Sequence, residues 1–130
     1  MSPDLPFDLR QAVDSVLEGH ALADLTARAV RISEGYRAGA TSARVVGAAE
    51  DAAAYALARL PATYAACARA FAEAAAAAPG FAPGSLMDAG AGPGGASWAA
   101  AETWPSLSSA TLLDTNPAFL YQQNTLRDAL

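Results

Sequence analysis

The first 78 residues carry apolar side chains at intervals of three and four, the spacing that gathers side chains on one face of a helix. Gly19, Gly39 and Pro61 interrupt this pattern at positions typical of helix boundaries, so it predicts four consecutive helices. The apolar face of the first predicted helix holds Leu9, Val13, Val16 and Leu17, and that of the third holds Val46, Ala49, Ala53, Leu57 and Leu60. We expect these two faces to pack against each other, with Pro61 opening the fourth helix.

The pattern changes after the turn-forming segment PGFAPGS, residues 79–85. A short apolar run at residues 85–89 leads into a glycine-rich turn, and a helical segment at residues 95–103 precedes a second apolar run at residues 110–114. Strand, turn, helix and strand in this order make a βαβ unit, in which a helical crossover joins two parallel strands. This part of the chain is therefore predicted to be α/β.

The sequence accordingly predicts two regions, a helical N-terminal region over residues 1–80 and the start of an α/β domain over residues 81–130. Asn116 and Pro117 supply a cap and a first residue for one more helix after the second strand. Ligands of such folds bind outside the carboxyl ends of the strands. The glycine-rich turn and Asp114 both fall there.

Composition limits the partners and the compartment. The net charge is −5 and 53% of residues are hydrophobic, which suits a globular domain and excludes a chain that coats nucleic acid, so no DNA partner is expected. An RNA partner would need a local basic patch, and the candidates for that patch are Arg28, Arg31, Arg37 and Arg44. No apolar run is long enough to cross a bilayer and no signal-type segment opens the chain, so we expect a cytoplasmic protein.

The single cysteine, Cys67, cannot form an internal disulfide and supplies too few ligands for a metal site. It lies in an alanine-rich segment that predicts a helix, so we interpret it as a small core residue. No metal is expected within these 130 residues.

The stretch LMDAGAGPGGASW, residues 86–98, is the strongest candidate for a ligand site. Gly90, Gly92 and Gly95 have the spacing G-x-G-x-x-G, and Asp114 follows about 20 residues later, as in dinucleotide-binding folds. Asp88 argues against a dinucleotide, because a carboxylate repels a pyrophosphate. S-adenosylmethionine has no phosphate and carries an ammonium and a sulfonium, so an acid beside it is favourable. Pro93 favours the same choice, because it removes one amide donor from the turn.

The acid and the alternating glycines Asp88, Gly90, Gly92 and Gly94, with Asp114 after the second strand, resemble the first motifs of class I S-adenosylmethionine-dependent methyltransferases. More narrowly, three segments resemble the bacterial relatives of the mitochondrial ribosomal small-subunit assembly methyltransferase-like proteins. These segments are LPATYAA (residues 60–66), DAGAGPGGASWAAAETWP (residues 88–105) and TLLDTNPAFL (residues 111–120). The resemblance covers nearly the whole chain.

The resemblance implies a Rossmann-like sheet that binds S-adenosylmethionine. The implied cofactor-binding residues are Asp88, Gly90, Ala91, Gly92, Gly94, Asp114 and Thr115. In such a site the glycines line the methionine end, Asp88 approaches the amino group, and Asp114 accepts hydrogen bonds from the ribose hydroxyls. Two positions depart from the pattern: Gly95 replaces a commoner threonine, and Thr115 stands where relatives often carry a basic residue.

The resemblance also implies a seven-stranded sheet, of which this chain offers two strands, so we expect an N-terminal fragment. The acceptor loop and the cysteine cluster that some relatives use for an iron–sulfur centre would follow, and the catalytic residues are unknown. Three hypotheses remain open. The first is a methyltransferase that acts on ribosomal RNA or associates with the small ribosomal subunit, the second a non-catalytic assembly factor with the same fold, and the third a dinucleotide-dependent oxidoreductase.

Overall fold

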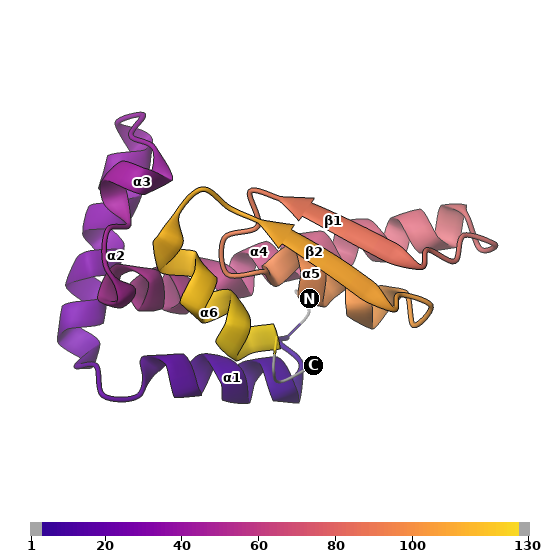
Figure 1. The fold of residues 1–130 in the computed structure, drawn as a ribbon, viewed down its shortest axis with the longest axis horizontal. Coiled ribbons are helices and arrows are strands. Elements are labelled where there is room, and N and C mark those ends of the chain that lie inside the picture. Colours follow the sequence, from indigo (N-terminus) through magenta and orange to yellow (C-terminus); the bar gives the residue numbers. More distant parts are fainter. Residues whose placement is uncertain (1–3, 128–130) are drawn as a thin grey trace.

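A computed structural model describes residues 4–127, and these residues contain both helices and strands (Figure 1). The elements in chain order are α1 (Phe7–Leu17), α2 (Leu22–Arg37), α3 (Ser42–Val45), α4 (Ala49–Ala77), β1 (Ser85–Ala89), α5 (Gly95–Thr103), β2 (Ser109–Leu113) and α6 (Pro117–Arg127). The helices of the N-terminal region precede a small parallel sheet. No helix among the described residues is long and apolar enough to span a membrane.

The two strands pair in parallel with α5 between them in the chain, so the predicted βαβ connection is confirmed. The register runs from Ser85 opposite Ser109 to Ala89 opposite Leu113. The second strand begins and ends one residue earlier than predicted, so Asp114 is the first residue beyond β2. Both strands therefore end at the same edge of the sheet, and the glycine-rich turn and Asp114 lie side by side there.

The predicted helix boundary at Pro61 is wrong, because α4 continues through this residue without interruption. A proline inside a helix removes one hydrogen bond and its ring crowds the carbonyl four residues earlier, at a cost of about 3 kcal/mol. Leu60 and Tyr64, on either side of Pro61, are buried in the same apolar cluster, whereas Pro61 itself is exposed. Tertiary packing on both flanks thus holds one helix where local preference predicts two.

The core consists of two apolar clusters, and α4 contributes to both. One cluster is made of Leu9, Ala12, Val13, Leu60, Tyr64, Trp98 and Ala99. The other is made of Leu25, Ile32, Val45, Val46, Ala52, Ala53, Ala54 and Phe119. The predicted packing of the first apolar face on the later one is confirmed in both clusters, since Leu9 and Val13 pack with Leu60, and Val16 and Leu17 pack against the cluster of Val46 and Ala53. Val46 itself precedes α4, so the predicted third helix begins later than expected. Figure 1 shows α4 running behind the sheet and α6, where it reaches the elements of both clusters.

The sheet is covered on one face only within the described residues. Leu86 and Leu112 are partly buried and line a cavity together with residues of α5, whereas Met87 and Leu113 point away from α5 and are exposed. Alternate residues of a strand face opposite sides of the sheet, which accounts for this division. The covered face and the helix α5 fix the position of the glycine-rich turn between them.

Candidate ligand site at the strand ends

The turn between β1 and α5 uses glycine where the backbone is left-handed. Gly90, Gly92 and Gly94 have φ angles of 71°, 54° and 97°, values that residues with a Cβ rarely adopt. A Cβ on Gly90 or Gly92 would meet no atom within 4 Å. Open space therefore lies beside the bare backbone of the turn.

Two amides at the start of the turn bind the end of the neighbouring strand. The N–H groups of Gly90 and Ala91 both donate to the carbonyl oxygen of Leu113, at 2.8 and 2.9 Å. This shared acceptor ties the turn to the last residue of β2. The two amides are consequently used inside the protein.

The remaining amides of the turn are also occupied. The N–H of Gly92 donates to Oδ2 of Asp114 at 2.8 Å, and the N–H of Gly94 donates to the carbonyl of Ala91 at 3.0 Å. Pro93 has no N–H to offer. Every amide from Gly90 to Gly94 thus has an acceptor within the protein, and the amides that a helix start leaves unpaired are those of the first turn of α5.

Asp114 joins the turn to the segment that follows β2. Its Oδ1 accepts a hydrogen bond from the N–H of Asn116 at 2.8 Å, while its Oδ2 accepts the one from Gly92. Each carboxylate oxygen has two acceptor positions, so one position on each oxygen remains for a ligand hydroxyl. Thr115, between these residues, is exposed.

Asp88 is the penultimate residue of β1 and is already hydrogen-bonded. The hydroxyl of Ser97 on α5 donates to its Oδ2 at 2.7 Å. The sequence reasoning did not single out Ser97, although it is the one hydroxyl in the first turn of an alanine-rich helix. Its bond holds one oxygen of the carboxylate and leaves Oδ1 for a further donor.

Gln123 on α6 is another contact that the sequence did not reveal. Its Nε2 donates to the carbonyl of Gly92 at 2.6 Å, so the tip of the turn is held from both its amide and its carbonyl. Nothing in a pattern of apolar positions marks a buried glutamine two turns into a helix as the partner of a distant glycine. The turn is thus fixed before any ligand arrives.

Gly95, the position that departs from the methyltransferase pattern, packs directly on α4. A Cβ placed there would lie 2.7 Å from Cδ1 of Leu60 and 3.8 Å from the side chain of Thr63. Glycine therefore permits the close approach of α5 to α4. This contact brings the middle of α4 alongside the glycine-rich turn.

Tyr55, five residues before Leu60 on α4, packs against α6, which follows β2. Its ring lies 5.2 Å from that of Phe119 and 6.3 Å from that of Tyr36, centroid to centroid. Burial raises the pKa of Tyr55, Tyr36 and Asp114 raise it further, and Arg59 lowers it. The tyrosine hydroxyl is consequently within electrostatic reach of both Arg59 and Asp114.

Cys67 is half-buried and packs against the cluster formed by α1, α4 and α5. Burial raises the pKa of its thiol, and Asp88 raises it further. A protonated thiol is a poor nucleophile and a poor metal ligand. Among the described residues no group of three or more histidine, cysteine or acidic side chains is arranged to hold a metal ion.

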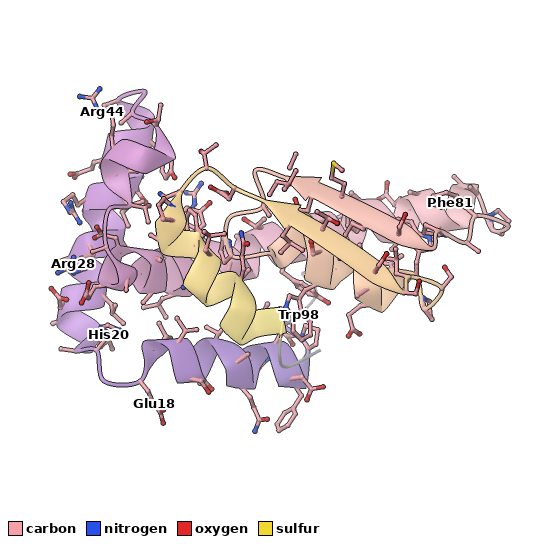
Figure 2. The ribbon with its side chains drawn as sticks, viewed as in Figure 1. Glu18, His20, Arg28, Arg44, Phe81 and Trp98 are labelled. Carbon is pink, nitrogen blue, oxygen red and sulfur yellow. The ribbon has the colours of Figure 1, made fainter. Side chains whose placement is uncertain are left out.

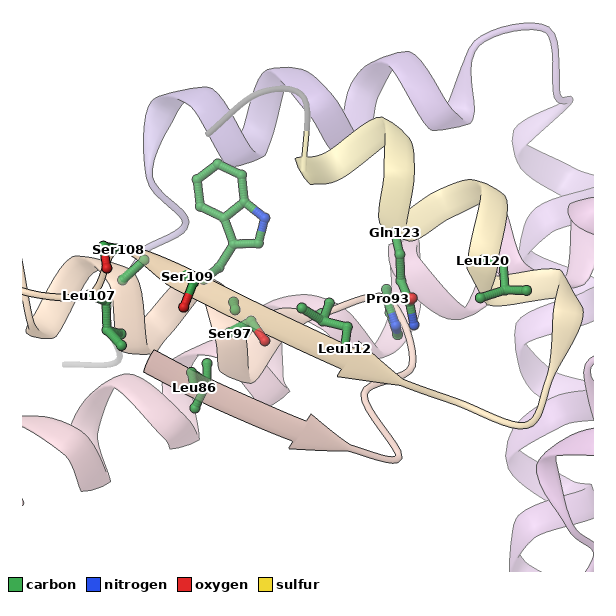
Figure 3. A pocket seen from close by; sticks show the side chains of 13 residues that line it. Leu86, Pro93, Ser97, Leu107, Ser108, Ser109, Leu112, Leu120 and Gln123 are labelled. Carbon is green, nitrogen blue, oxygen red and sulfur yellow. The ribbon is translucent and has the colours of Figure 1, made fainter. Parts of the chain in front are cut away.

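A cavity of about 640 Å³ lies beside the sheet and reaches the glycine-rich turn, where Pro93 and Gly94 line it (Figure 3). Leu86 and Leu112 of the strands, Trp98 of α5 and Leu120 of α6 contribute to its lining. Neither Asp88 nor Asp114 lines it. The cavity adjoins the candidate site, because Ser97 and Gln123, which bind Asp88 and Gly92, also line it.

The predicted basic patch is partly used within the fold. Arg28 donates to Oδ1 of Asp51 at 3.1 Å and to Asp24 at 2.9 Å, and Arg31 also pairs with Asp51. Arg44 is exposed at the α3 end of the molecule (Figure 2). Two of the four candidate arginines, Arg28 and Arg31, thus form ion pairs with Asp51 within the fold.

A family model described as mitochondrial small ribosomal subunit Rsm22 matches residues 49–129. The matched segment is more than half of the chain and contains α4, both strands and the glycine-rich turn. No curated protein matches the chain.

Proposed function

The chain belongs to the Rsm22 family of the mitochondrial small ribosomal subunit, and from this premise we propose that it associates with the small ribosomal subunit and binds S-adenosylmethionine as a methyltransferase. The family description supports the ribosomal part of the proposal. The chemistry of the strand-end site supports the cofactor part.

The observation that carries the cofactor proposal is the carboxylate of Asp88, which lies half-buried near the end of β1, beside the glycine-rich turn. A dinucleotide would bring its pyrophosphate to the turn and the start of α5, next to this carboxylate, which would repel it. A ligand with positive charge and hydroxyl groups fits the same surroundings. S-adenosylmethionine has an ammonium, a sulfonium and a ribose, and no phosphate.

Different residues of the site would bind different parts of the cofactor. Open space beside Gly90 and Gly92 would take the methionine end, and Oδ1 of Asp88 would attract the ammonium. The acceptor positions left on Asp114 would take the ribose hydroxyls. When bound, the cofactor supplies an activated methyl group on its sulfonium, so the protein chiefly orients donor and acceptor.

Calorimetric titration of the protein with S-adenosylmethionine, S-adenosylhomocysteine and NAD tests this proposal. We expect the two adenosyl ligands to bind and NAD to give no heat above dilution. Asp114→Ala should weaken adenosyl binding by about tenfold or more, which corresponds to about 1.4 kcal/mol. Gly92→Val should also weaken it, because a side chain would occupy the open space, whereas Gly80→Val, in a turn remote from the strand ends, should not.

Binding of NAD would refute the charge argument, and unchanged affinity in Asp114→Ala would refute the assignment of the site. If no nucleoside binds but the protein sediments with small ribosomal subunits, the second hypothesis, a non-catalytic assembly factor, takes its place. The family description favours that alternative as the runner-up.

A further inference from the structure

The segment that builds the strand-end site contains acids and no basic residue. From residue 70 to residue 126 the sequence has neither arginine nor lysine, while Asp88 and Asp114 stand at the ends of the two strands. A zwitterionic ligand carries a carboxylate that these acids would repel. A cation that matches this carboxylate has to come from an element packed against the site.

Helix α4 is one such element, and it carries Arg59 and Arg69 in its middle and later turns. Arg69 pairs with Glu73 at 3.6 Å and lies ten residues further on, about 15 Å along the helix axis. Arg59 is exposed and makes no ion pair among the residues that the structure describes. Arg59 is therefore the cation that α4 has available.

The surroundings of Arg59 place it beside the glycine-rich turn. Tyr55, four residues earlier on the same face of α4, contacts Phe119 just beyond β2 and lies within electrostatic reach of Asp114. Thr63, four residues later, lies beside Gly95 at the start of α5. Arg59 falls between these two contacts on α4.

We propose that Arg59 binds the α-carboxylate of the amino-acid end of the cofactor, opposite the ammonium that Asp88 attracts. This inference rests on the proposed function and assigns a residue outside the glycine motif to the same ligand. Arginine suits this role because its planar guanidinium can donate two parallel hydrogen bonds to a carboxylate.

The test compares S-adenosylmethionine with decarboxylated S-adenosylmethionine, which keeps the ammonium and the sulfonium but lacks the carboxylate. Affinities are measured by calorimetry for the wild-type protein, Arg59→Leu and Arg59→Lys, with Arg69→Leu as a matched control on the same helix. We expect Arg59→Leu to weaken binding of S-adenosylmethionine by about tenfold and to leave binding of the decarboxylated ligand unchanged. Arg59→Lys should retain part of the affinity, and Arg69→Leu all of it.

Three results would overturn the inference, and they are distinguishable from failure of the proposed function. Arg59→Leu with unaltered affinity for S-adenosylmethionine would show that the arginine makes no contact. An equal loss for both ligands would indicate a structural effect on the site, as would a loss that Arg69→Leu reproduces. Failure of the wild-type protein to bind either ligand would refute the proposed function, and this inference with it.

Discussion

Asp51 on α4 offers the sharpest test of how the helical region is held together. Its side chain is only 6% exposed and accepts hydrogen bonds from Arg28 at 3.1 Å, from Arg31, and from the backbone amide of Gly47 at 3.1 Å. It therefore links α2, α4 and the segment between α3 and α4. Asp51→Asn keeps the size of the side chain and removes its charge.

The magnitude follows from the exposure of the partners. A fully buried pair that loses one partner costs about 3–5 kcal/mol, but Arg28 and Arg31 are 31% and 58% exposed and remain solvated. Each arginine pair therefore contributes about 0.5–1 kcal/mol, near the range of exposed pairs. With a weaker bond to the Gly47 amide, we expect Asp51→Asn to lower the free energy of unfolding by about 2 kcal/mol and Tm by about 6–8 °C.

The stability that Asp51 contributes should depend on pH, and the direction of its pKa shift fixes how. Burial alone would raise the pKa of Asp51, but the Gly47 amide and the guanidinium groups of Arg28 and Arg31 outweigh it, so the pKa lies below its ordinary value. A lowered pKa in the folded state gives stability that is present above about pH 4, the unfolded value, and is lost as the pH falls through the folded value. The difference between wild type and Asp51→Asn should thus be constant from pH 5 to 7 and shrink below pH 4.

Urea denaturation followed by circular dichroism measures this difference at each pH. Asp24→Asn is the matched control, because Asp24 pairs with the same Arg28 but is half exposed, and it should cost no more than about 0.5 kcal/mol. Equal losses for Asp51→Asn and Asp24→Asn would refute the argument from burial. A difference that persists unchanged at pH 3 would refute the electrostatic origin of the stability.

Two further predictions concern packing and capping. Gly95→Val should lower stability by about 1–3 kcal/mol in urea denaturation, because its Cβ would lie 2.7 Å from a Leu60 side chain that is 1% exposed, and an unchanged midpoint would contradict this contact. Asn116→Ala should lower the free energy of unfolding by about 1–2 kcal/mol. The Asn116 side chain accepts a hydrogen bond from the amide of Ala118 at the start of α6 and donates one to the carbonyl of Val46. In thermal unfolding Asn116→Asp should recover the cap alone, and full recovery would show that the Val46 contact contributes nothing.

The sequence correctly predicted those helix and strand boundaries that depend on a few neighbouring residues. Asn116 and Pro117 open α6 as predicted, and β1 spans the predicted residues 85–89, because capping oxygens, proline and short apolar runs act over a few neighbouring residues. The left-handed glycines of the turn follow for the same reason. The sequence alone also indicated Asp88 and Asp114 as the acids at the strand ends, since parallel strands end at one edge of a sheet.

Other features depend on contacts between distant parts of the chain. Pro61 looked like a helix boundary, yet the burial of Leu60 and Tyr64 carries α4 through it at the expense of one local hydrogen bond. Only the fold brings Asp114 onto the amide of Gly92 and places α4 beside the turn. Local helix preferences differ by about 0.7 kcal/mol or less for ordinary residues and by about 3 kcal/mol for proline. Burial across the core outweighs them, so it decides which helices continue and which side chains meet at the site.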